Sequence, residues 1–68
     1  MQISIKGARV EKGLTQLQAA REMGVTRETI ANWEKGNTAP SAPQLMELCR
    51  VYGVSITDIF LPDKLAKS

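Results

Sequence analysis

Apolar residues recur along the 68-residue chain at intervals of three and four, in short segments separated by glycine-containing corners. This spacing is typical of amphipathic helices. The fullest example has apolar residues at offsets of 0, 3, 4 and 7, namely Leu45, Leu48, Cys49 and Tyr52. It predicts a core helix over residues 42–52. A shorter version, with Ile56, Ile59 and Phe60, predicts a helix over residues 56–61.

One corner pattern occurs three times, as Gly13-Leu14-Thr15, Gly24-Val25-Thr26 and Gly53-Val54-Ser55. The glycine suits the left-handed end of one helix, and the hydroxyl suits the N-cap of the next. The apolar residue between them is placed to pack on the fourth residue of the following helix, which is Ala19, Ile30 or Ile59. Capping boxes are predicted where Thr15, Ser41 and Ser55 precede Gln18, Gln44 and Asp58 by three residues.

These patterns predict an all-α fold with helices over residues 4–12, 16–23, 27–35, 42–52 and 56–61. Gly36 ends the third helix, and Pro43 falls in the first turn of the fourth, where proline is tolerated. Gly7 weakens the first helix by about 1 kcal/mol relative to alanine. The expected architecture is one compact five-helix domain over residues 1–61, with a short tail over residues 62–68.

The helix predicted over residues 27–35 has a narrow apolar stripe, formed by Ile30 and Trp33. Its other side gathers five residues at offsets of 0, 1, 4, 5 and 8: Arg27, Glu28, Ala31, Asn32 and Lys35. Arginine, asparagine and glutamate are side chains that meet guanine, adenine and the cytosine amino group. An ordinary solvated face fits the same pattern, and Glu28 also suits the positive end of the helix dipole.

Charge and composition limit the classes of function that the chain can have. The net charge is +2, and residues 1–35 hold the whole excess, with six basic and four acidic side chains. This asymmetry points weakly to an anionic partner. The chain has no histidine and one cysteine, Cys49, which the pattern places in the core with redox sensing as a remote alternative. We therefore expect no metal site, no cofactor and no enzyme activity.

The chain also contains no run of about 18 apolar residues and no apolar stretch near Met1 of the kind that signal peptides have. We expect a cytoplasmic protein without a membrane anchor.

The stretch from Arg9 to Pro40 closely resembles the lambda-repressor-like (Cro/CI-type, XRE) helix-turn-helix family. The matching positions are Arg9, Thr15, Gln16, Ala20, Gly24, Val25, Thr26, Ile30, Glu34, Gly36 and Pro40. With the last two predicted helices, the resemblance covers nearly the whole chain. One departure is Ala19, where the family usually has leucine.

The resemblance implies roles for individual residues. It implies base reading by Arg27, Glu28 and Asn32, with flanking contacts from Thr29 and Ala31. It implies phosphate contacts from Gln16, Lys35, Asn37 and Thr38. Arg9 and Glu34 match a structural ion pair between the first and third helices. Trp33 is expected in the core rather than against a base, and Lys6 and Lys12 as solvated surface lysines.

The resemblance thus implies a sequence-specific regulator of transcription, a repressor, that binds double-stranded DNA with the helix at 27–35 in the major groove. The expected assembly is a homodimer on a palindromic operator, joined through residues 56–61, including Leu61, and the tail. The alternative is an antitoxin-like module that binds a partner protein and autoregulates through DNA binding.

Overall fold

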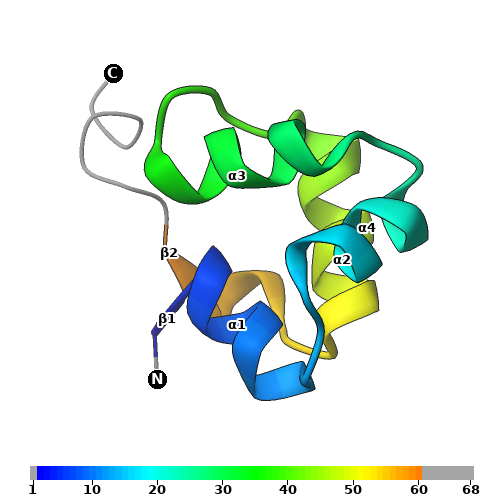
Figure 1. Cartoon of the computed structure of the whole chain (residues 1–68). Coiled ribbons are helices and arrows are strands. Elements are labelled where there is room, and N and C mark those ends of the chain that lie inside the picture. Colours follow the sequence, from blue (N-terminus) through cyan, green and yellow to red (C-terminus); the bar gives the residue numbers. More distant parts are fainter. Residues whose placement is uncertain (1, 61–68) are drawn as a thin grey trace.

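Four α-helices surround one core in the computed structural model, which describes residues 2–60 (Figure 1). The element order is β1 (Ile3–Ser4), α1 (Ile5–Lys12), α2 (Gln16–Met23), α3 (Arg27–Lys35), α4 (Ala42–Tyr52), a 3-10 turn η1 (Ile56–Asp58) and β2 (Ile59–Phe60). The first four predicted helices are confirmed, with only the start of α1 displaced by one residue. No helix within residues 2–60 is long and apolar enough to cross a bilayer.

Local cap chemistry explains where the helices begin and end. A serine or threonine hydroxyl accepts a backbone N–H at the start of each α-helix, from Ser4, Thr15, Thr26 and Ser41 in turn. Full capping boxes form at α2 with Gln18 and at α4 with Gln44. The glycine after each α-helix is left-handed, with φ between 72° and 84°. The corners are therefore set by residues next to one another in sequence.

The fifth helix, predicted over residues 56–61, is wrong, whereas the described part of the chain is mostly helical, as the predicted all-α class requires. Residues 56–58 form a single 3-10 turn, after which Ile59 and Phe60 pair in parallel with Ile3 and Ser4. The Ser55 hydroxyl accepts the amide of Thr57 at 3.4 Å. β-Branched residues at positions 3 and 59 favour extended backbone. The Ile59 amide donates to the Ile56 carbonyl, which closes the turn just before the paired segment. Leu61 and the predicted tail lie outside the described residues.

Close packing against Ile3 and Ser4 explains the glycine at position 7, inside α1. A Cβ atom at this position would lie 3.0 Å from Ile3 Cγ1 and 3.1 Å from Ser4 Oγ. The missing side chain lets β1 lie close against the helix, where β2 joins it (Figure 1).

The core is built from residues of all four α-helices: Ile5, Ala8, Ala19, Ala20, Ile30, Trp33, Leu48 and Tyr52. Trp33 is 3% exposed, which confirms its expected core position, and Cys49 is buried as expected. The three apolar corner residues Leu14, Val25 and Val54 pack against this cluster. The Tyr52 hydroxyl is buried without a hydrogen-bond partner among residues 2–60.

We expect this hydroxyl to make stability sensitive to alkaline pH. Burial first, and then the charge of Glu34, raise the pKa of Tyr52 to about 12, whereas tyrosine in an unfolded chain titrates near about 10. The folded state keeps its proton in a range where the unfolded state loses it. This contribution to stability is therefore complete below about pH 10 and falls by about 2–3 kcal/mol as the pH rises toward about 12.

Chemical unfolding across that range, compared with Tyr52→Phe, measures the effect. The Phe variant should lose this component of the pH dependence and, because the unpaired hydroxyl is gone, be at least as stable at neutral pH. The chain has one tyrosine, so tyrosinate absorbance follows Tyr52 directly. Equal alkaline slopes in the two proteins would contradict the prediction.

Candidate nucleic-acid interface

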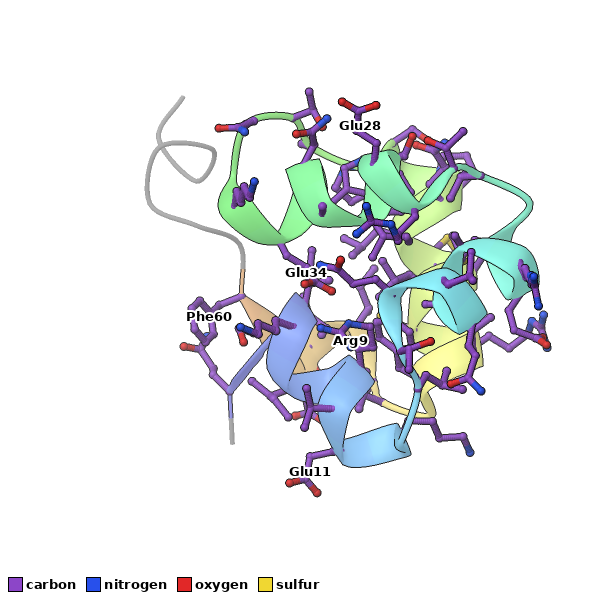
Figure 2. All side chains as sticks on the ribbon, viewed as in Figure 1. Arg9, Glu11, Glu28, Glu34 and Phe60 are labelled. Carbon is purple, nitrogen blue, oxygen red and sulfur yellow. The ribbon has the colours of Figure 1, made fainter. Side chains whose placement is uncertain are left out.

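Helices α2 and α3, joined by the Gly24 corner, present one polar face to solvent. On that face Arg27, Glu28 and Lys35 are exposed, and Ala31 and Asn32 are half-buried. Figure 2 shows Glu28 on the outer side of α3, directed away from the rest of the molecule. The opposite stripe of α3, Ile30 and Trp33, is buried. A helix with one face fixed in the core and the other free can enter a groove without refolding.

Thr29 differs from the other residues of the predicted reading set, because it is tied into the start of its own helix. Its amide donates to the Thr26 hydroxyl at 3.2 Å, and the two hydroxyls lie 2.9 Å apart. The side chain thus supports the N-cap of α3.

Beneath this face, Arg9 of α1 and Glu34 of α3 form an ion pair in the interior (Figure 2). Arg9 Nε donates to Glu34 Oε2 at 2.6 Å and Nη2 to Oε1 at 3.3 Å, while Nη1 donates to the Leu14 carbonyl at 2.8 Å. The side chains are 9% and 5% exposed. The hydrogen bonding to Glu34 is the main cause that raises the pKa of Arg9 above its ordinary value.

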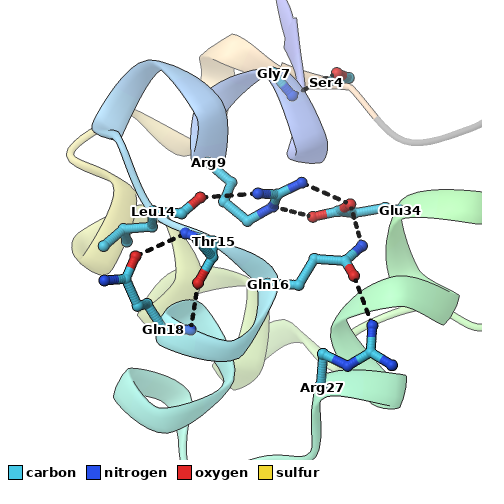
Figure 3. A network of polar contacts seen from close by, with 9 residues as sticks. All are labelled: Ser4, Gly7, Arg9, Leu14, Thr15, Gln16, Gln18, Arg27 and Glu34. Atoms are coloured by element: carbon cyan, nitrogen blue, oxygen red, sulfur yellow. Dashed lines mark hydrogen bonds and ion pairs between the residues drawn. The ribbon is translucent and has the colours of Figure 1, made fainter.

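Gln16 links this pair to the outer face (Figure 3). Its Nε2 donates to Glu34 Oε1 at 3.0 Å, and its Oε1 accepts from Arg27 Nη1 at 3.4 Å. The resemblance implied only a phosphate contact for Gln16. The sequence did not reveal this double contact, because it depends on the angle at which α2 and α3 meet.

The segment after α3 folds back on the end of the helix. The amides of Asn37 and Thr38 lie 3.0 and 3.5 Å from the Asn32 carbonyl oxygen. The Asn37 side chain reaches the Asn32 side chain, with Nδ2 3.4 Å from Oδ1. Asn37 therefore contacts a residue of the predicted reading set, which sequence reasoning did not anticipate. Lys35 and Thr38 are exposed beside it.

Other parts of the surface offer little for chemistry. An open depression of about 610 Å³ lies between the end of α1 and the start of α2, next to Gln16 and Arg27. Within residues 2–60 no group of three or more Cys, Asp or Glu side chains is placed to hold a metal ion. Lys6 and Lys12 are exposed on α1.

Residues 5–59 match the helix-turn-helix family. This range includes α1 to α4 and the Gly24 corner between α2 and α3. The chain belongs to the lambda-repressor-like (XRE) helix-turn-helix family. It is 38% identical over 63 residues to an HTH-type transcriptional regulator of Archaeoglobus fulgidus, covering 93% of this chain and 90% of the relative. It is 42% identical over 65 residues to one from Methanothermobacter thermautotrophicus, covering 94% of each chain.

A further relative is the antitoxin PezA of Streptococcus pneumoniae, at 34% identity over 62 residues. The match covers 91% of this chain but 39% of the antitoxin. No solved structure matches the chain. The similarity thus covers at least 90% of each of these two regulators, but less than half of the antitoxin.

Replacing Arg9 by alanine should destabilise this helix-turn-helix domain, because it would leave the Glu34 side chain, which is 5% exposed, in the interior without its ion-pair partner. We expect a loss of about 3 kcal/mol, which lowers the Tm of a domain of this size by about 10–20 °C. Thermal unfolding followed by circular dichroism measures it.

The matched control is Arg50→Ala. Arg50 pairs with Glu47 on the surface, with side chains 69% and 42% exposed, and loss of such a pair should leave the Tm almost unchanged. If Arg9→Ala kept its Tm and lost DNA binding, Arg9 would belong among the DNA contacts instead.

Proposed function

We propose that this protein is a sequence-specific DNA-binding regulator of transcription that reads the major groove with α3 and acts as a repressor. The observation that carries the proposal is the exposed face of α3, where hydrogen-bonding side chains stand on a helix whose other face is fixed in the core. The family and the names of the full-length relatives support the same function. A domain bound across a promoter excludes polymerase, which favours repression, and we place the protein in the cytoplasm with its DNA.

The exposed residues divide into two kinds of contact. Arg27, Glu28 and Asn32 read base edges, with Ala31 beside a thymine methyl group and Thr29 at the flank. Lys35 and Thr38 contact phosphates at the end of α3. The N–H of Gln16 that is not bonded to Glu34 is available to a phosphate at the start of α2, where backbone amides also point outward.

Loss of a base contact and loss of a phosphate contact should change DNA binding in different ways. Arg27→Ala or Asn32→Ala should weaken the preferred site by about 1–3 kcal/mol and relax preference at one base position, because a base contact discriminates between sequences. Lys35→Ala should weaken all duplexes alike and lower the slope of log affinity against log salt by about one. Titration of a selected duplex and an unrelated duplex at several salt concentrations separates these outcomes.

Glu28→Gln serves as the charge test in the same assay. Removing a carboxylate that phosphates repel should tighten binding to unrelated DNA while blurring the preferred sequence. If Arg27→Ala, Asn32→Ala and Glu28→Gln all left the selected sequence unchanged, α3 would not be the reading element.

The second prediction for this function concerns symmetry. One recognition helix covers about half a site, so useful affinity needs two copies about 34 Å apart on one face of the duplex. Unbiased selection of bound duplexes should return an inverted repeat, and the complex should contain two chains by analytical ultracentrifugation. A monomer bound to a non-palindromic optimum would contradict it. Phe60 and Ile56, which are 44% and 47% exposed, lie in the segment proposed to join the copies.

A second candidate function is an antitoxin-like module that binds a partner protein and autoregulates through DNA. The similarity to PezA favours it, although that similarity covers only part of the antitoxin. Co-purification of a stoichiometric partner with the tagged protein from its native cells would distinguish this function from that of a regulator acting alone.

A further inference from the structure

The contact between Asn32 and Asn37 joins the reading face to the loop behind it. Gly36 ends α3 with a φ of +82°, and this left-handed turn brings the next two amides back to the Asn32 carbonyl. The same turn places the Asn37 carboxamide beside the Asn32 carboxamide, where Asn37 Nδ2 donates to Asn32 Oδ1 at 3.4 Å. The backbone therefore holds the two side chains together before any DNA is present.

A carboxamide has two chemically different ends, one oxygen that accepts and one amino group that donates. The Asn37 amino group lies against the Asn32 side-chain oxygen. Rotation of the Asn32 carboxamide alone by 180° would therefore place two amino groups opposite one another. The Asn32 amino group is consequently directed away from Asn37. In this arrangement the Asn32 amino group is the end that is available for a base.

We propose that Asn37 is a specificity-determining positioning residue, which selects the end of Asn32 that meets the DNA without contacting a base itself. The proposal rests on the proposed function, since it requires Asn32 to read a base. In the orientation of the structure, the Asn32 amino group is the reading end. It suits a base edge that presents an acceptor in the major groove, such as purine N7 or thymine O4.

Asn37→Asp tests the proposal, because aspartate has nearly the same shape but can only accept when ionised. The Asn32 amino group must then turn toward residue 37, and its oxygen becomes the reading end. Unbiased selection of bound duplexes should show one position in each half-site changing to a base that presents an amino group, adenine or cytosine. We expect a change in relative affinity of about tenfold at that position. Asn37→Ala should relax preference at the same position.

Thr38→Asp is the matched control for charge. It places a carboxylate one residue further along, on another exposed side chain, and should weaken all duplexes while leaving the base preference as it is. Asn37 is itself exposed, so its variants should fold, and a thermal melt of each confirms that before selection.

The outcomes are distinguishable. If the unaltered protein selects no sequence, the proposed function and this inference both fail. If it selects a sequence, Asn32→Ala relaxes one position and both Asn37 variants keep the original preference, the inference is wrong and the function stands. If Asn37→Ala weakens every duplex equally with no change in preference, Asn37 is a phosphate contact, and the inference is again wrong.

Discussion

The ion pair between Arg9 and Glu34 is the constraint on which the reading face depends. Three guanidinium nitrogens of Arg9 have acceptors, two on Glu34 and one on the Leu14 carbonyl, and Glu34 also accepts from Gln16. Desolvation offsets much of the attraction in such a pair, so its net contribution to stability is modest. Its separation, however, would leave an uncompensated charge in the interior. Helices α1 and α3 are therefore held in one relative position.

Side-chain contacts restrict residues at both ends of α3. At the start of the helix, Gln16 connects the ion pair to Arg27. At the end of the helix, the turn at Gly36 independently brings Asn37 to Asn32. An arginine side chain has about 2 kcal/mol of rotamer entropy to lose on binding. Contacts that already restrict Arg27 and Asn32 in the free protein lower the cost of ordering them on DNA. A small domain can thus present a defined pattern of hydrogen-bonding groups from one short helix.

The sequence was sufficient to predict the boundaries of the α-helices, because residues adjacent in sequence determine them. Each α-helix begins at a serine or threonine cap and ends at a glycine, and both are readable without tertiary information. The β1–β2 ladder was not readable, because it joins Ile3 to Ile59 across most of the chain. A three-residue turn followed by Ile59 and Phe60 has the same apolar spacing as a helix. The contacts of Gln16 and Asn37 were also missed, because they depend on how the turns between elements orient side chains relative to one another.

The ladder also changes what the end of the domain can offer a second copy. A helix over residues 56–61 would have presented one continuous apolar stripe. In the structure Ile59 packs against the core, and of the apolar residues at 56–60 only Ile56 and Phe60 are exposed. Two side chains are a small part of the roughly 800 Å² per partner that a stable interface buries. Within the described residues, a dimer joined here would draw little affinity from its own interface. The two copies would then be brought together mainly by binding to neighbouring half-sites on the duplex. Operator symmetry and protein assembly would therefore depend on one another.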